Sequence, residues 1–252
     1  MFLNVHDLPQ HVAEQELAGN AVIVVDVLRA STTICQSLAS GAREVVPFLE
    51  VEETISAAAR GDREAIVLGG ERGGMRIEGF DLGNSPAEFT PQAVAGRRVF
   101  ITTTNGTRAL QHARRARRVL IGAFVNLSAV VASVKDDVRV DILCAGTDGR
   151  ETGEDILAAG AIVSRLAESP GPVRWLNDVA RQARQEWESV LNRSAAASRS
   201  ISEQLAIEFR ETPGGRNLVE IGLESDLKAC AQVDRLGIVP ELEVSKWRIA
   251  LP

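Results

Sequence analysis

The chain has 252 residues and carries 34 acidic against 28 basic side chains, which gives a formal net charge of −6 at pH 7. A hydrophobic fraction of 45% and a charged fraction of 25% are typical of a globular protein and exclude a largely disordered one. The negative charge argues against a protein that binds nucleic acid or anionic lipid. One local basic run is interpreted as a solvated helix face: Arg114, Arg115, Arg117 and Arg118.

The cysteines and the lack of long apolar runs indicate a soluble protein of the cytoplasm. Cys35, Cys144 and Cys230 are an odd number without paired spacing, which is typical of reduced thiols rather than of a disulfide framework. Residues 1–10 lack the pattern of a secretion signal, and no run approaches the roughly 18 apolar residues that a membrane span needs. We therefore expect one compact unit over residues 1–252, without a membrane partner.

Strands and helices alternate along most of the chain. Residues 21–28, AVIVVDVL, form a short β-branched run that predicts a central parallel strand buried on both faces. Residues 29–33 offer hydroxyl groups suited to a helix N-cap, and a helix is expected to follow as far as Gly41. Further strands are predicted at 43–48, 64–71, 98–106 (ending in a loop), 118–124 and 140–146, and further helices at 51–61, 107–116, 128–135 and 154–168. This alternation predicts a three-layer α/β/α fold with a mainly parallel sheet.

An internal echo and the C-terminal third complete the expected organisation. Residues 24–34 and 100–110 share the order strand, polar turn, helix, which predicts two similar subdomains from duplication, about 1–95 and 96–252. Two closing apolar strands are expected to be able to pair across a homodimer. The remaining elements are two amphipathic helices within 177–210, a turn at 212–215, a short helix at 224–234, and the closing strands at 238–244 and 246–251.

Polar residues gather where the predicted strands end. Ligands of an open parallel sheet bind at the carboxyl ends of the strands, so these residues are expected to share one edge. Glycine and threonine turns offer N–H groups to anions, and carboxylates are suitable ligands for Mg²⁺. The mixture predicts a phosphorylated substrate with a divalent cation. It consists of Asp26, Glu71, Arg72, the turn Thr102–Gly106 and the segment that starts at Cys144.

Several of these residues also have a purely structural interpretation. The threonine turn can cap a helix, and Asp26 can be an N-cap or a buried partner of an ion pair. Glu154 and Asp155 suit the first turn of a helix because of its dipole. The glycine-rich segment 69–86 is long for a passive connection, and long ordered loops tend to bind ligands. Its end, Ser85 followed by Pro86, also suits a helix start.

Five segments in this order resemble the 2-phosphosulfolactate phosphatase family over most of the chain. The resemblance implies a Mg²⁺-dependent phosphohydrolase that acts on phosphate esters of 2-hydroxycarboxylic acids, with a duplicated α/β/α fold. It is weakest near 180–210. The segments are VVDVLRASTTI (24–34), GERGGMRIEGFDLGNSP (70–86), TTTNGT (102–107), CAGTDGRETGED (144–155) and AQVDRLGIVPEL (231–242).

The chemistry of the residues then suggests their roles toward a small anionic phosphate ester. Asp26 and Asp155 are predicted to be catalytic, and Asp26, Glu71 and Glu154 to hold Mg²⁺. The remaining candidates are predicted to bind the anionic groups of the substrate: Arg29, Arg72, Asn84, Ser85, Thr102, Thr103, Thr104, Asn105, Gly106 and Cys144.

Three mechanisms remain open at this level. In the first, a carboxylate, Asp155 or Asp26, activates water at a phosphoryl group polarised by Mg²⁺. In the second, Asp26 is the nucleophile, although position 28 is leucine where haloacid-dehalogenase-type phosphatases have a second acid. The third is a metal-independent cysteine phosphatase that uses Cys144 and Arg150. Outside enzymes, the alternative is a non-catalytic α/β module that binds a phosphorylated metabolite.

Overall fold

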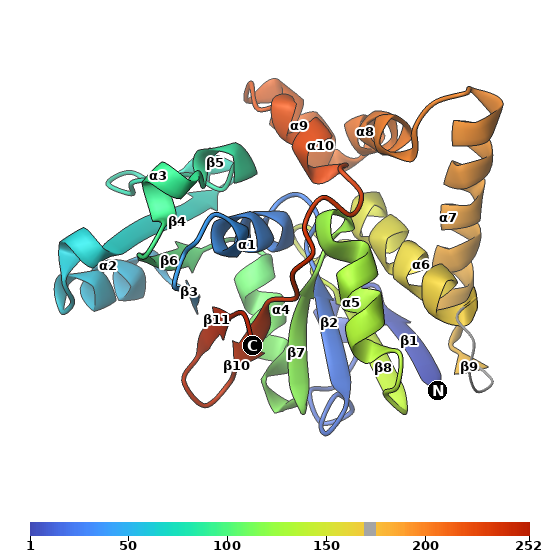
Figure 1. The fold of residues 1–252 in the computed structure, drawn as a ribbon, viewed down its shortest axis with the longest axis horizontal. Helices are drawn as coiled ribbons and strands as arrows, with labels where there is room; N and C mark the ends of the chain where they lie inside the picture. The colour runs from blue at the N-terminus through green and yellow to red at the C-terminus, as the bar shows by residue number, and fades with distance from the viewer. Residues whose placement is uncertain (169–174) are drawn as a thin grey trace.

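The computed structural model describes residues 1–168 and 175–252, and within them eleven strands form one sheet (Figure 1). The strand order is β5-β4-β6-β3-β11-β10-β7-β2-β8-β1-β9, and the pairs among β1–β4 and β6–β9 are parallel. The strands are β1 (Phe2–His6), β2 (Ala21–Val25), β3 (Glu44–Phe48), β4 (Ile66–Arg72), β5 (Met75–Arg76), β6 (Arg98–Thr102), β7 (Arg118–Gly122), β8 (Arg139–Cys144), β9 (Trp175–Leu176), β10 (Glu241–Glu243) and β11 (Arg248–Ala250).

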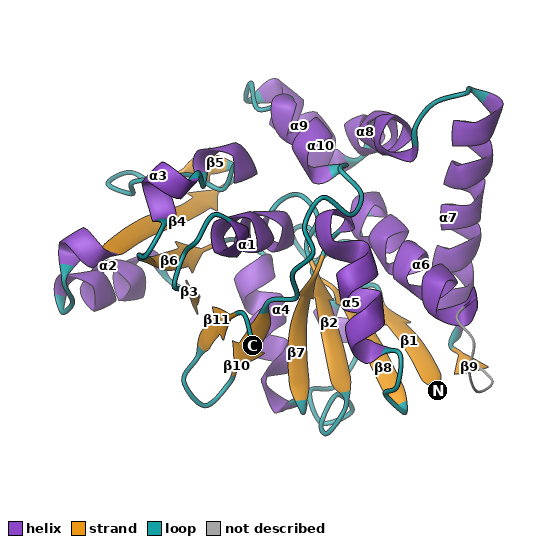
Figure 2. Ribbon diagram, viewed as in Figure 1, coloured by secondary structure: helices purple, strands orange, loops and turns teal. Residues whose placement is uncertain are grey.

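Helices cover both faces of this sheet (Figure 2). Alternate residues of β2 show why its unbroken apolar run is a strand: Ile23 packs in the core under α5, α6 and α7, and Val24 packs in the core under α1 and α4. The three-layer α/β/α prediction is confirmed. The helices are α1 (Ala30–Ala39), α2 (Val51–Ala59), α3 (Pro91–Val94), α4 (Gly106–His112), α5 (Leu127–Val134), α6 (Gly153–Glu168), α7 (Asp178–Ala196), α8 (Ile201–Glu211), α9 (Pro213–Glu220) and α10 (Ser225–Cys230).

The C-terminal strands lie in the middle of the sheet rather than at an edge. β10 and β11 form an antiparallel hairpin; β10 pairs with β7, and β11 pairs with β3. The two closing strands predicted from the sequence are therefore present, but their pairing partners belong to the same chain. The expectation that these strands pair across a dimer is wrong for that reason, and a homodimer formed by another surface stays a prediction.

The strand order also bears on the predicted duplication. Both echo segments form a strand, a turn and a helix, as β2 with α1 and as β6 with α4. However, β2 lies between β7 and β8, and β6 lies between β3 and β4. Residues 1–95 and 96–252 thus each contribute strands to both halves of the sheet. A boundary near residue 95 does not separate two groups of neighbouring strands, and the duplication itself stays a prediction.

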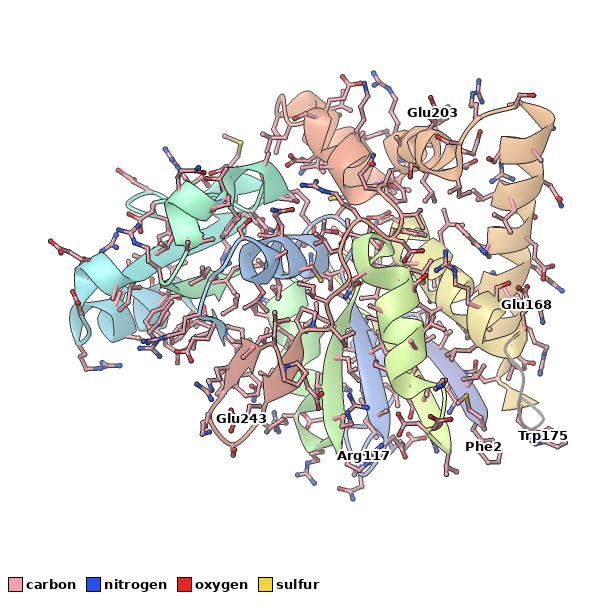
Figure 3. The ribbon with its side chains drawn as sticks, in the orientation of Figure 1. Phe2, Arg117, Glu168, Trp175, Glu203 and Glu243 are labelled. Atoms are coloured by element: carbon pink, nitrogen blue, oxygen red, sulfur yellow. The ribbon has the colours of Figure 1, made fainter. Side chains whose placement is uncertain are left out.

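Some local expectations need correction. The hydroxyl groups of residues 31–33 lie inside α1, whose N-cap is Arg29. Residues 212–215 are not a turn alone, because Thr212 caps α9 and accepts a hydrogen bond from the N–H of Gly215. Strand β1, with the sequence FLNVH, was not among the predicted strands. The basic run 114–118 does not form a helix face. Its first two arginines end the helical turn Ala113–Arg115, and its last arginine begins β7. Each of its four arginines pairs with an acidic side chain, and Figure 3 labels one of them, Arg117.

The C-terminal helices position part of the site. Helices α8, α9 and α10 lie together above the edge of the sheet at which β2 ends (Figure 1), and α6 packs extensively against α7.

None of the helices within the described residues is both long and apolar enough to cross a membrane.

Candidate active site

A cavity of about 330 Å³ opens at the carboxyl ends of four strands. Loops that follow β2, β4, β6 and β8 converge on it, and the N-terminal turn of α9 closes one side. The cavity brings together Asp26, Glu71 and the threonine turn, as the sequence predicted. Its lining includes Asp26, Arg29, Glu71, Asn84, Thr103, Thr104 and Asn105. A more open groove of about 670 Å³ between α8 and α10 contains none of these residues.

Asp26 directly follows β2 and is held at the start of α1. Its Oδ1 accepts a hydrogen bond of 3.1 Å from the N–H of Ala30. Within the described residues its Oδ2 accepts none, and a Cβ atom placed on Gly106 would lie 2.7 Å from this oxygen. Only glycine therefore allows α4 to start this close to Asp26. Burial raises the pKa of Asp26 to about 8, and the nearby carboxylates Asp155 and Glu71 add to the rise.

Glu71 and Asp155 both use their two oxygens to accept hydrogen bonds from backbone N–H groups. Glu71 accepts from Thr104 and Gly74, each at 2.7 Å. Asp155, in the first turn of α6, accepts from Val27 at 2.8 Å and from the loop after β8 at 3.1 Å. Burial raises the pKa of Asp155 to about 7, with a contribution from its neighbour Glu154. Glu71 lines the cavity, whereas Asp155 lies behind it.

Glu154 has an oxygen without a partner although it is buried. Its side chain lies behind the N-terminal turn of α9, close to Gly214, and its Oε2 has no hydrogen bond within the described residues. Burial raises the pKa of Glu154 to about 7, although the hydroxyl of Thr212 lowers it, and Asp26 contributes to the rise. A buried carboxylate oxygen without a partner lowers the stability of the fold unless a bound ligand interacts with it.

The free oxygens of Asp26 and Glu154 suit a small divalent cation. Mg²⁺ is usually held by one or two carboxylates, with water and substrate phosphate supplying its other ligands. In residues 1–168 and 175–252, no three His, Cys, Asp or Glu side chains are arranged to enclose a metal ion by themselves. The donor set thus fits Mg²⁺ bound together with a phosphate ester, rather than a cage built by the protein alone.

Arg29 reaches the cavity, but its guanidinium is already engaged. It donates hydrogen bonds of 2.7 Å to Asp226 on α10 and to the carbonyl of Gly74. Ser85 donates to the other oxygen of Asp226 at 2.6 Å and does not line the cavity. This buried network ties α1, the glycine-rich segment and α10 together. Ser85 therefore supports the wall of the cavity and does not cap the following turn.

Other predicted residues also lie outside the lining. Arg72 donates hydrogen bonds to the carbonyl of Leu49 and to the hydroxyl of Thr102. It therefore links the end of β4 to the loop before α2 and to the end of β6. Thr102 is fully buried at that contact. Gly106 packs against Ala30 below the cavity. The predicted substrate contacts of Arg72, Thr102 and Gly106 are thus not supported by their positions.

Some lining residues were missed from the sequence. Gly73 and Gly74 of the β4–β5 turn contribute, as do Thr147 and Asp148 after β8. The first turn of α9 contributes as well. Threonine followed by proline at residues 212–213 is a helix-start signal that is visible in the sequence. Nothing local to that sequence could indicate that α9 faces the ends of β2 and β4.

Cys144 is a core residue. It is the last residue of β8, is fully buried and packs among the apolar side chains under α6. Burial raises the pKa of the Cys144 thiol well above its usual value, and the Asp155 carboxylate raises it further. Arg150 is exposed and does not line the cavity. The structure therefore argues against the cysteine phosphatase mechanism and against a substrate contact of Cys144.

We expect Cys144→Ala to keep phosphate release within about threefold of the unmodified protein. A nucleophilic thiolate would be lost entirely in this variant, whereas a core thiol leaves only a small cavity. The measurement is the initial rate of phosphate release by the purified variant, with its thermal melting compared alongside. A loss of about 100-fold or more in a folded variant would restore the thiolate mechanism.

The buried carboxyls predict an unusual pH dependence of stability in the absence of divalent cations. The ordinary pKa of an unfolded carboxyl is near 4, whereas the pKa of Asp26 in the folded protein is about 8 and the pKa values of Glu154 and Asp155 are about 7. Between these values the folded chain holds protons that the unfolded chain has released, so rising pH favours unfolding. In EDTA, Tm is expected to fall by roughly 5 °C or more from about pH 5.5 to 8.5. Asp26→Asn should flatten this decline, and a Tm that stays constant in unmodified protein would contradict the explanation.

The comparisons with known proteins cover nearly the whole chain. A sequence model of the 2-phosphosulpholactate phosphatase family matches residues 6–245. The chain is 37% identical over 244 residues to a probable 2-phosphosulfolactate phosphatase of Caldanaerobacter subterraneus subsp. tengcongensis, with 96% of each chain covered. It is 41% identical to one of Symbiobacterium thermophilum, with 90% of this chain and 92% of the relative covered, and 40% identical to one of Synechococcus sp., with 90% of each covered. Since the matched residues include every segment that lines the cavity, this chain belongs to the 2-phosphosulfolactate phosphatase family.

Proposed function

We propose that this protein hydrolyses 2-phosphosulfolactate to sulfolactate and inorganic phosphate, with Mg²⁺ as its metal ion. The observation that carries the proposal concerns two carboxylate oxygens that lack hydrogen-bond donors in the described residues. One belongs to Asp26, which lines the polar cavity, and the other to Glu154, which is buried behind Gly214 in the α9 wall of that cavity. The relatives support the substrate, because they are named as probable phosphatases of the same compound.

Asp26 and Glu154 are the residues that would hold Mg²⁺. Bound there, the ion supplies positive charge that neutralises the phosphate oxygens and polarises the phosphoryl group. Asp26 is the carboxylate whose unbonded oxygen borders the cavity, so we place it in contact with the phosphoryl group. A cation beside it favours the ionised form of Asp26, because an opposite charge lowers the pKa of a carboxyl.

The remaining polar groups of the cavity suit the other oxygens of the substrate. Two buried oxygens of this region have no hydrogen bond within the described residues: the hydroxyl oxygen of Thr104 and the side-chain carbonyl oxygen of Asn84. Thr103 and Asn105 border the same space. The Thr104 hydroxyl and the NH₂ group of Asn84 can donate hydrogen bonds to the phosphate and carboxylate of the ester, and the Asn84 carbonyl can accept one only from a donor such as water. The guanidinium of Arg29 adds positive charge at the wall.

Turnover by purified protein tests the proposal against a non-catalytic binding module. The protein is stripped with EDTA, supplied with Mg²⁺ and incubated with 2-phosphosulfolactate, phospholactate or phosphoglycolate, and released phosphate is measured. We expect release from 2-phosphosulfolactate that stops when EDTA is added again. Binding of the ester without any release would favour the module instead. Phosphate release that persists in EDTA would support the phosphatase activity but contradict the proposal that it requires Mg²⁺.

A further inference from the structure

We propose that Glu71 is a positioning residue that clasps two cavity loops together, and that it is not a ligand of the metal ion. This inference rests on the proposed function for the identity of the reaction. The clasp itself rests on hydrogen bonds that are present without any ligand.

The two hydrogen bonds of Glu71 join segments that are distant in sequence. Its Oε1 accepts from the N–H of Thr104, in the turn between β6 and α4, and its Oε2 accepts from the N–H of Gly74, in the turn between β4 and β5. Both are 2.7 Å long, which is typical of a charge-assisted hydrogen bond. Because β4 and β6 are paired in parallel, the two turns leave the sheet side by side. One carboxylate therefore fixes the distance between two walls of the cavity.

The other half of the sheet contains the same device. Asp155 accepts from the N–H of Val27, after β2, and from the N–H of Gly146, after β8. Strands β2 and β8 are also paired in parallel. A carboxylate that accepts one backbone N–H from each of two neighbouring loops thus occurs twice around one cavity. Asp26 and Glu154, in contrast, each keep an oxygen without a donor.

The chemistry of the clasp explains why the position requires a carboxylate. A glutamine offers one acceptor oxygen, and its NH₂ group would face the second N–H donor. Glu71→Gln therefore releases either the turn that contains Thr104 or the turn that contains Gly74. Thr104 borders the cavity, and the carbonyl of Gly74 accepts a hydrogen bond from the guanidinium of Arg29. The substitution should loosen anion binding while the oxygens of Asp26 and Glu154 stay in place.

The experiment compares Glu71→Gln with the unmodified protein and with Asp234→Asn. Asp234 is the control, because its carboxylate also accepts a backbone N–H, that of Ser128, and neither residue lines the cavity; its other oxygen pairs with Arg165. Three properties are measured: hydrogen exchange of the Thr104 and Gly74 amides, affinity for inorganic phosphate by calorimetry, and the Mg²⁺ concentration that gives half-maximal activity. We expect faster exchange at one or both amides and a phosphate affinity about 10-fold to 100-fold weaker. The Mg²⁺ requirement should stay within about threefold.

Two results would overturn the inference. One is unchanged exchange at both amides, which would show that Glu71 does not hold them. The other is a Mg²⁺ requirement raised by about 10-fold or more with unchanged phosphate affinity, which is the behaviour of a metal ligand. If Glu71→Gln does not fold, Glu71→Asp replaces it, because its shorter side chain keeps the charge but reaches only one of the two amides. Absence of turnover in the unmodified protein would refute the proposed function alone, since exchange still tests the clasp.

Discussion

Replacing Asp26 with asparagine is expected to lower kcat for phosphate release by roughly 100-fold or more. The amide oxygen of asparagine can still accept the N–H of Ala30, so the start of α1 keeps its support. The NH₂ group takes the place of the unbonded Oδ2, and a hydrogen-bond donor can neither bind a cation nor act on the phosphoryl group. The initial rate of phosphate release at saturating Mg²⁺ is the measurement.

Stability provides the control for this variant. Asp26 is buried, and its pKa is raised by burial and by two neighbouring carboxylates, so removing its charge relieves an unfavourable arrangement. Tm of Asp26→Asn should therefore equal or exceed that of the unmodified protein at pH 8, which separates lost chemistry from lost folding. Turnover within about threefold of normal would remove Asp26 from the reaction.

The part of the site that follows from the sequence depends on short-range patterns. The run at 21–28 and the glycine and threonine turns after other strands place polar groups at one edge of a parallel sheet, because such strands all point the same way. Asp26, Glu71 and Thr104 meet in one cavity for this reason. No detailed contact is needed for that inference.

The roles of individual side chains could not be predicted, because they depend on partners far along the chain. Arg29 looks like a free cation in the sequence, but Asp226, 197 residues later, pairs with it. Glu71 is predicted as a metal ligand from the sequence, which gives no sign that the turn 33 residues later supplies an N–H to its carboxylate. Cys144 looks reactive because it precedes a glycine-rich loop, whereas its depth in the core decides its pKa.

Topology sets a further limit on prediction from sequence. The pattern of strands and helices predicts a parallel sheet but does not give the order of its strands. The closing hairpin is inserted between β3 and β7, where it joins the two groups of parallel strands. Its alternating apolar residues are equally compatible with an edge, which is why a pairing across a dimer was expected. A local pattern of burial cannot distinguish these two positions.

Substituting Gly160 with alanine is expected to reduce the free energy of unfolding by roughly 2–3 kcal/mol. Alanine is intrinsically better than glycine inside a helix by about 1 kcal/mol, so propensity alone predicts the opposite sign. However, a Cβ atom on Gly160 would lie 2.1 Å from the carbonyl oxygen of Ala183, because α6 and α7 approach each other closely there. The helices would have to separate, and equilibrium urea unfolding measures the cost.

Gly237→Ala is the matched control for this prediction, because a Cβ atom there meets no atom within 4 Å and the backbone conformation suits alanine. Its free energy of unfolding should stay within about 0.5 kcal/mol of the unmodified value. Movement of α6 would also shift Glu154 and Asp155, which stand in the first turn of this helix. Phosphate release by Gly160→Ala should therefore fall even at temperatures where the variant is fully folded. Equal stability of the two variants would show that α6 and α7 are not packed as closely as their backbones indicate.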